Sequence, residues 1–186
     1  ILLQNGHHPT MGVEWFEELF RDLMARYPQL HLHAMSPPEI HHLSKVSKCT
    51  TLEVLQRLQC AGMASMPGGG AEILTEGVRE KIAPRKATTE DWLRIMEEAH
   101  SLGMKTTATM MFGHLESGAD RVEHLDRLRQ VQDRTGGFTA YIGWTFQPGG
   151  NPLGDRLVTE GWHKATHAQY FRMTALSRIF LDNFDN

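Results

Sequence analysis

Cysteine is scarce in this sequence, and long apolar runs and an excess of basic residues are missing. The only cysteines are Cys49 and Cys60, and their spacing fits neither a disulfide framework nor a zinc site. No apolar run reaches the roughly 18 to 20 residues that cross a bilayer. The formal net charge is -3, with Lys and Arg scattered among Asp and Glu, which offers no basic field for nucleic acid. We therefore expect a cytoplasmic protein with no membrane insertion and no nucleic-acid partner.

Short apolar segments alternate with amphipathic helical patterns along the 186 residues. That alternation is typical of βαβ units around a parallel sheet. The expected strands cover residues 1–4, 30–35, 63–66, 106–112 and 138–146. Their starts lie roughly 30 to 40 residues apart, which is the length of one βα unit. A last helix is expected over 170–181, after a Gly- and Pro-rich connection over 147–154.

The predicted fold class is α/β, a parallel β/α barrel of the TIM type. Such barrels have eight strands and typically need at least about 200 residues, whereas this sequence offers five strands. We expect a single domain over residues 1–186, partial as given, with about five βα units and truncated at both ends.

In a β/α barrel the chemistry lies where the strands end, because the following loops converge at one mouth. The first strand is followed by Gln4-Asn5-Gly6-His7-His8-Pro9, in which Gln4 and His7 are the main candidates. The third strand runs into Pro67-Gly68-Gly69-Gly70-Ala71-Glu72. Three consecutive glycines carry a large entropic penalty, which suggests a loop whose backbone comes close to a ligand. The Glu72 carboxylate is suited to accept hydrogen bonds from ribose hydroxyls or a cationic amine.

Several other polar residues near strand ends have a structural explanation beside the functional one. Ser36 and Glu39 follow the second strand and are equally typical of a helix cap. Arg79 follows the glycine loop in a helical turn, where a solvated surface role is the default. His114 follows the fourth strand and is either a ligand contact or a capping group.

The end of the fifth strand carries two neutral hydrogen-bonding side chains. We expect Thr145 and Gln147 on one face with Gly143, because side chains alternate along a strand. Such groups beside aromatic surface suit a planar, polar organic substrate. Packing alone would explain Trp144 and Phe146.

Two other classes of function stay open at this point. His31 and His33 on one face of the second strand, with His114 at another strand end, have a spacing compatible with the zinc site of a metal-dependent hydrolase. Against that class, no Asp stands at a strand end as a bridging ligand. The other alternative is an inactive fragment that retains only binding.

Five segments of the sequence also carry a family resemblance. They are Gln4-Asn5-Gly6-His7-His8-Pro9, His33-Ala34-Met35-Ser36-Pro37-Pro38-Glu39-Ile40, Met66-Pro67-Gly68-Gly69-Gly70-Ala71-Glu72-Ile73, Thr109-Met110-Met111-Phe112-Gly113-His114, and Thr135-Gly136-Gly137-Phe138 through Gln147-Pro148. Together they closely resemble the cyclic dehypoxanthinyl futalosine synthases, which are radical S-adenosylmethionine (SAM) enzymes of menaquinone biosynthesis. Aminofutalosine synthases and deazaflavin-forming enzymes share the Pro-Gly-Gly-Gly-Ala-Glu loop, so aminofutalosine synthase is the nearest alternative.

The resemblance implies a radical SAM barrel with two cofactors, SAM and a [4Fe-4S] cluster that receives its electron from a donor. Reduction of SAM releases a 5′-deoxyadenosyl radical, which abstracts hydrogen from the ribose part of dehypoxanthine futalosine and leads to the cyclised product. No catalytic residue is assigned. The SAM-binding positions that it implies are Asn5, Gly6, His7, Gly68, Gly69, Gly70, Glu72, Arg79 and His114. The substrate-binding positions are Gln4, Ser36, Glu39, Thr145 and Gln147.

One departure from the family concerns the cluster. The family's Cys-x-x-x-Cys-x-x-Cys motif is absent from this sequence. Cys49 and Cys60 do not replace it, because three thiolates must reach one cluster. We therefore expect no metal ligands in this chain, and the predicted activity belongs to a parent protein.

Overall fold

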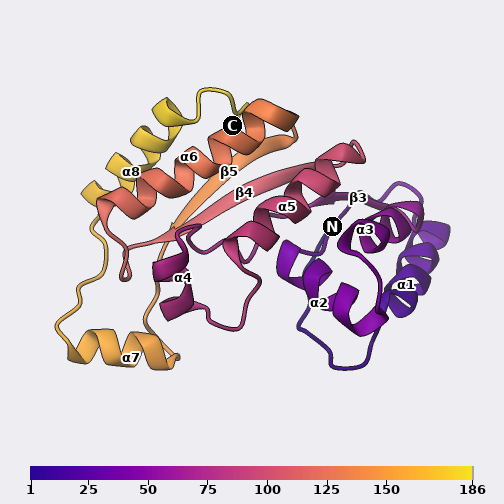
Figure 1. Cartoon of the computed structure of the whole chain (residues 1–186), viewed down its shortest axis with the longest axis horizontal. Helices are drawn as coiled ribbons and strands as arrows, with labels where there is room; N and C mark the ends of the chain where they lie inside the picture. The colour runs from indigo at the N-terminus through magenta and orange to yellow at the C-terminus, as the bar shows by residue number, and fades with distance from the viewer. Residues whose placement is uncertain (186) are drawn as a thin grey trace.

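The computed structural model describes residues 1–185, which form one parallel sheet of five strands in the order β1-β2-β3-β4-β5 (Figure 1). The strands are β1 (Leu2–Leu3), β2 (Leu32–Ala34), β3 (Met63–Met66), β4 (Lys105–Phe112) and β5 (Phe138–Thr145). All five strands expected from the sequence are confirmed, within one or two residues at each end. The shortest are β1 and β2, which pair with their neighbours over only a few residues.

Eight helices are found among the described residues. They are α1 (Val13–Arg26), α2 (Pro37–Ser47), α3 (Thr51–Cys60), α4 (Glu76–Ile82), α5 (Thr89–Ser101), α6 (Gly118–Thr135), α7 (Pro152–Thr159) and α8 (His167–Phe180). The expected last helix corresponds to α8. The connection expected over 147–154 ends early, because Asn151 caps α7 through its side chain and Pro152 occupies the first turn, a position that proline favours.

The strand order supports the predicted partial barrel. Each strand pairs in parallel with the next one along the chain, and right-handed crossovers between such neighbours put the connecting helices on the same side of the sheet. Figure 1 shows β4 and β5 beneath α5, α6 and α8, with α1 to α3 grouped beside the shorter strands. The sheet is thus an arc of a β/α barrel, with its other face not covered by the described helices.

A continuous apolar core fills the space between the sheet and the helices. Trp92 of α5, Phe20 of α1 and Leu32 of β2 are fully buried in it. Glycines with positive φ angles precede three of the strands: Gly62 has φ +116° before β3, Gly103 has φ +74° before β4 and Gly136 has φ +58° before β5. In the described part of the chain, no helix combines the length and apolarity of a membrane span.

Candidate functional site

The loop after β1, the start of α2 and the glycine loop after β3 meet at the carboxyl ends of the strands. A Cβ atom placed on Gly69 would clash with Gln4 Nε2 and lie 3.3 Å from Ser36 Cβ. Gln4 is exposed and Ser36 is buried. The structure therefore brings together two of the expected substrate-binding residues and the middle glycine of the expected SAM loop.

The three glycines of the loop are required for different physical reasons. Gly68 lies against the backbone of β4, since a Cβ atom there would clash with the Thr107 carbonyl oxygen. Gly68 N donates to Thr107 Oγ1 at 3.0 Å, and Thr109 Oγ1 donates to Gly68 O at 2.5 Å. Gly70 has φ +73° and no room beside Pro38. Packing thus explains Gly68 and Gly70. At Gly69 the Trp92 indole Nε1 donates to the carbonyl oxygen at 3.2 Å, and the Cβ position is limited chiefly by the movable end of the Gln4 side chain.

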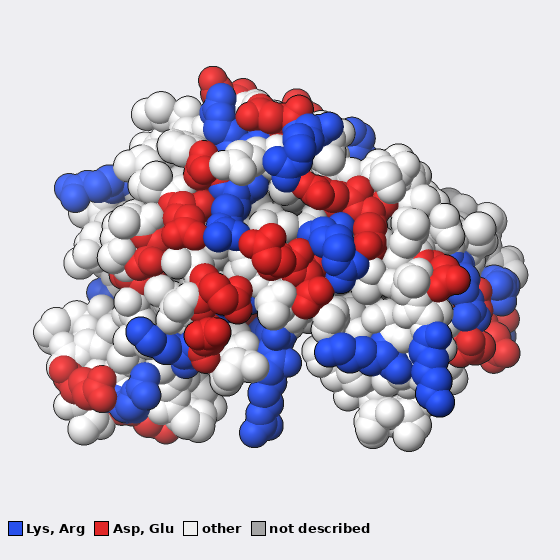
Figure 2. Space-filling view, in the orientation of Figure 1, with Lys and Arg blue, Asp and Glu red and all other residues white. Residues whose placement is uncertain are grey.

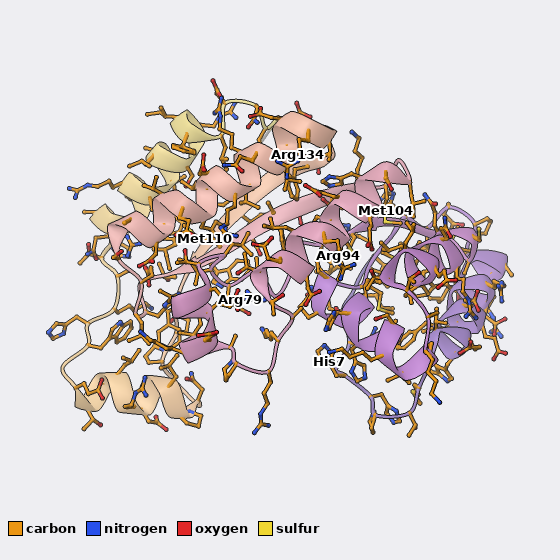
Figure 3. The ribbon with its side chains drawn as sticks, in the orientation of Figure 1. His7, Arg79, Arg94, Met104, Met110 and Arg134 are labelled. Carbon is orange, nitrogen blue, oxygen red and sulfur yellow. The ribbon has the colours of Figure 1, made fainter. Side chains whose placement is uncertain are left out.

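Arg79 holds the glycine loop in place through hydrogen bonds to its backbone. It is 1% exposed, and its guanidinium donates to the carbonyl oxygens of Gly70 at 2.9 Å, Ala71, and Ala87 at 2.8 Å. Burial lowers the pKa of its guanidinium, and the neighbouring Glu72 and Glu76 oppose that shift. Figure 3 shows Arg79 between α4 and the sheet. The expectation of a surface arginine is wrong. The expected place of Arg79 among the SAM-binding positions does not fit a guanidinium already bonded to backbone carbonyls.

Glu72 follows the glycine loop with an unusual backbone. Its φ is +48°, a left-handed conformation that costs a non-glycine residue about 1 kcal/mol or more. Its carbonyl oxygen accepts from Met111 N at 2.7 Å, which ties the loop to β4. Its Oε1 accepts from Lys86. Within residues 1–185 no hydrogen bond reaches Oε2, so that oxygen is available to a ligand hydroxyl.

Ser36 and Glu39 cap the N-terminus of α2, which is the structural explanation expected from the sequence. They form a capping box, in which Glu39 Oε2 accepts from Ser36 N at 2.7 Å and Ser36 Oγ at 2.5 Å. Glu39 Oε1 also accepts from Asn5 N at 2.5 Å. Glu39 therefore joins the start of α2 to the β1–α1 loop, because the same carboxylate binds Ser36 and the backbone N–H of Asn5.

His7 stands at the open end of the same loop. Its ring stacks on that of His42 in α2, with centroids 4.7 Å apart and an interplanar angle of 6°. Partial burial, reinforced by His42, lowers the pKa of His7, which favours the neutral imidazole. Figure 3 shows it beside α2, on the side where the strand-end loops gather.

His114 belongs to the turn after β4 rather than to an open surface. Its side chain is fully buried, its Nε2 lies 3.0 Å from Met111 O, and its Nδ1 accepts from Leu115 N at 2.7 Å. The buried Glu116 carboxylate accepts from Gly113 N at 2.5 Å and pairs with Arg121 at 2.6 Å. His114 is thus a structural group of this turn, the second of the two explanations, and its ring is closed to a ligand.

Thr145 is the last residue of β5, and Gln147 follows it by two residues. Thr145 is level with Phe112 in the β4–β5 register, and the Phe112 ring stacks on Tyr170 of α8 at 6.2 Å. Thr145 therefore faces the helices, and Trp144 is the neighbour that faces the uncovered side of the sheet. Gln147 Nε2 donates to Thr145 Oγ1 at 3.1 Å. The expected placement of Thr145 on the substrate side does not fit this register.

The three imidazoles of the hydrolase alternative do not converge on one point, because His114 does not join His31 and His33. His31 Nε2 and His33 Nδ1 both lie 2.6 Å from Ser65 Oγ, whereas His114 is closed in its own turn. Among residues 1–185 no group of three or more His, Cys, Asp or Glu side chains is arranged to hold a metal ion. Cys49 is partly buried and Cys60 exposed, and neither forms a disulfide. The described residues therefore do not fit an iron–sulfur cluster.

Several residues at this edge of the sheet were not singled out from the sequence. Thr107 and Thr109 bind Gly68 from the uncovered face of β4, and Lys86 pairs with Glu72. His42 and His41 lie in α2 beside His7. The strand alternation of Thr107 and Thr109 was readable, but the pairing of Lys86 across 14 residues depends on how the α4–α5 connection returns.

Comparison with known proteins decides the family. A model of the radical SAM superfamily matches residues 2–128. The chain belongs to the radical SAM superfamily. That stretch covers β1 to β4 together with the Gly69 region and Glu72, so the loops described above lie within the part shared with the superfamily.

Several curated proteins are similar over nearly all of this chain. Cyclic dehypoxanthine futalosine synthase of Streptomyces coelicolor is 46% identical over 98% of this chain and 44% of its own length. Aminodeoxyfutalosine synthase of Thermus thermophilus is 44% identical over 99% of this chain and 49% of its own length. A 5-amino-6-(D-ribitylamino)uracil–L-tyrosine 4-hydroxyphenyl transferase of Methanosarcina barkeri is 37% identical over 97% of this chain and 48% of its own length. The chain thus spans about half the length of these curated relatives.

Proposed function

We propose that the natural protein carrying this chain cyclises dehypoxanthine futalosine in menaquinone biosynthesis. The observation that carries the proposal is the 46% identity with a cyclic dehypoxanthine futalosine synthase across 98% of this chain. The chain's part is to hold SAM and the substrate at the carboxyl ends of the strands. When bound, SAM supplies the group that abstracts a hydrogen atom from the ribose of the substrate.

The residues around Gly69 suit SAM. The lack of a side chain at Gly69 lets a planar or ribose group approach closely. Glu72 Oε2 is suited to accept from ribose hydroxyls while Oε1 keeps Lys86. Partial burial lowers the pKa of His7 and so favours the neutral ring, in which one nitrogen can accept a hydrogen bond from the SAM ammonium group. Asn5 and Gly6 would bring their backbone to the same amine.

Arg79 acts indirectly in this proposal. By fixing the carbonyl oxygens of Gly70 and Ala71, it keeps the Gly69 backbone in the shape that receives SAM. Gln4 is our candidate on the substrate side, because its amide lies over Gly69 and is exposed.

The test is a product assay with the natural protein, reconstituted with iron and sulfide under anaerobic conditions. SAM, a reductant and dehypoxanthine futalosine are added, and the products are separated and identified by mass spectrometry. The proposal expects 5′-deoxyadenosine together with a cyclised product. If neither forms while the cluster absorbs normally, the proposal is overturned.

Aminodeoxyfutalosine synthase is the second candidate, because 44% identity over 99% of this chain is close to the value for the cyclising enzyme. The same assay separates the two, since only the cyclising enzyme turns over dehypoxanthine futalosine. A protein that cleaves SAM but leaves this compound unchanged would favour the second candidate.

The setting and the electron source complete the proposal. Cys49 and Cys60 are free thiols, which suits a reducing, cytoplasmic compartment. A one-electron donor protein or a chemical reductant such as dithionite would serve the cluster of the natural protein.

A further inference from the structure

A small pocket lies beside the proposed SAM site, between the β1–α1 loop, α2 and the connection from α4 to α5. Its volume is about 100 Å³. The basic and imidazole side chains that line it are His7, His41, His42, Lys45, Arg85 and Lys86. Figure 2 shows Lys and Arg side chains bordering the notch at the lower edge of the molecule, between α4 and α2.

No carboxylate lines this pocket, and the acidic groups around it are already bound. The Glu39 carboxylate accepts from Asn5 and Ser36. Glu72 pairs with Lys86. Asp91 lies 3.9 Å from His41 but holds Arg94 at 2.8 Å. The positive side chains therefore have little local compensation.

Lys45 and Arg85 are the cations of the pocket lining that have no acidic partner among the described residues. Both are exposed, and within residues 1–185 neither takes part in an ion pair or a side-chain hydrogen bond. They approach one pocket from separate elements, Lys45 from α2 and Arg85 from the connection to α5. Long cations on two sides of one small space are arranged to close on a charge of opposite sign.

His7 and His41 add imidazole nitrogens to the lining of the pocket, whereas His42 Nε2 already donates to His8 O at 2.8 Å. Burial lowers the pKa of both His7 and His41, and Lys45 and Arg94 add to the shift at His41 although Asp91 opposes it. At His7 the pKa is lowered further by His42 and Lys86 and raised by Glu39. An anion bound in the pocket would oppose the effect of these neighbouring positive groups and raise the pKa of both histidines.

We propose that this pocket binds an oxyanion, a carboxylate or phosphate group, with Lys45 and Arg85 as the charged arms and His7 as a neighbouring donor. The volume is sufficient for one such group. The group is therefore either a small free anion or the charged end of a molecule whose remainder lies over the Gly69 region. The proposal does not depend on the cyclisation reaction.

The test follows the histidine C2–H resonances of the chain by NMR during titration with inorganic phosphate and, separately, with benzoate. Saturable shifts are expected at His7, His41 and His42. No such shifts are expected at the two control residues, His163 in the segment before α8 and His167 at the start of α8. The double variant Lys45→Gln/Arg85→Gln should bind the same anion about tenfold more weakly, because each exposed charge contributes a few-fold.

The matched control is Arg172→Gln, an exposed arginine of α8. It changes the net charge in the same direction and should leave the affinity unchanged. Thermal unfolding of each variant establishes that the fold is intact, and the exposure of Lys45 and Arg85 makes this the expected result. Equal weakening by Arg172→Gln, or unchanged affinity in the double variant, would overturn the proposal.

A competition arm identifies the source of the oxyanion. Displacement of phosphate by SAM assigns the pocket to the cofactor carboxylate. Displacement by benzoate with no effect of SAM assigns it to a carboxylate of another ligand. Both results support an oxyanion site. Shifts of equal size at all histidines would instead indicate non-specific screening of charge by the added salt and would contradict the proposal.

Discussion

The Arg79 guanidinium donates to the Gly70 carbonyl oxygen at 2.9 Å from beneath the glycine loop. The same side chain also holds Ala71 and Ala87. A buried arginine therefore connects the loop to the segment that carries Lys86, the partner of Glu72. The shape of the proposed SAM site depends on a residue that touches no ligand.

Replacing Arg79 with methionine tests this relationship. The substitution leaves three carbonyl groups without this donor, and those of Ala71 and Ala87 are buried. Each buried group left unpaired costs about 1 to 3 kcal/mol. We expect the free energy of unfolding in urea to fall by about 3 kcal/mol or more. Arg79→Lys should fold but bind SAM more weakly, because one ammonium group does not span the three carbonyl oxygens.

Arg85→Met is the matched control for stability, since Arg85 is exposed in the same connection. Its unfolding free energy should stay within about 0.5 kcal/mol of the natural sequence. Equal stability of Arg79→Met and Arg85→Met would contradict the role given to Arg79.

A pair of glycine variants separates packing from ligand access. Gly68→Ala would force a methyl group against the Thr107 backbone oxygen, so we expect a loss of about 2 kcal/mol or more in stability. Gly69→Ala would meet the flexible end of Gln4, which can move aside. It should fold nearly normally and lower the affinity for SAM by a large factor, measured by calorimetry. Similar stability losses in both variants would count against this distinction.

His114 provides a test of a site assignment. Because its ring is buried and bonded within its own turn, His114→Ala should lower the unfolding free energy by about 1 to 3 kcal/mol. The affinity of the folded protein for SAM should change little. A large loss of SAM binding with unchanged stability would show that His114 meets the cofactor after all.

Two buried histidines predict how stability depends on pH. Burial lowers the pKa of His100 to about 4 and that of His124 to about 3, from an ordinary 6.5. Below pH 6.5 the unfolded chain takes up protons that these folded-state imidazoles do not bind. Stability is therefore fully present above pH 6.5 and falls as the pH drops toward 4, by up to about 1.4 kcal/mol per pH unit for each histidine.

Urea unfolding at pH 7, 6 and 5 measures this slope. His100→Gln should reduce it, because glutamine does not titrate and can still bond Thr106 and Thr135, the partners of His100. His163→Gln, at an exposed position, should leave the slope unchanged. A slope that is the same in all three proteins would rule out buried histidines as its cause.

The fold was largely predictable because local residues mark the limits of each strand. Met63–Met66 lies between Gly62 and a glycine loop, so apolar content and turn residues agree on its limits. The helix α7 was less predictable. It begins inside a Gly- and Pro-rich stretch, where the cap formed by Asn151 with Gly154 N overrides the composition.

The candidate site was predictable as a set of loops but not as a set of contacts. The glycine loop and the polar residues after β1 can be found from the sequence, and Gln4 and Gly69 do meet. The burial of Arg79 was not predictable, because it depends on carbonyl groups that only the returning connection presents. Alternation groups Thr145 with Gly143 but does not say which side of the sheet they face, and only the register with β4 decides that this side faces α8.

The most direct test of the proposed function is deuterium transfer from substrate to cofactor. Dehypoxanthine futalosine labelled with deuterium in its ribose is incubated with the reconstituted natural protein, SAM and reductant. We predict that 5′-deoxyadenosine gains one deuterium as the cyclised product appears. Unlabelled 5′-deoxyadenosine with the substrate recovered intact would contradict the proposal.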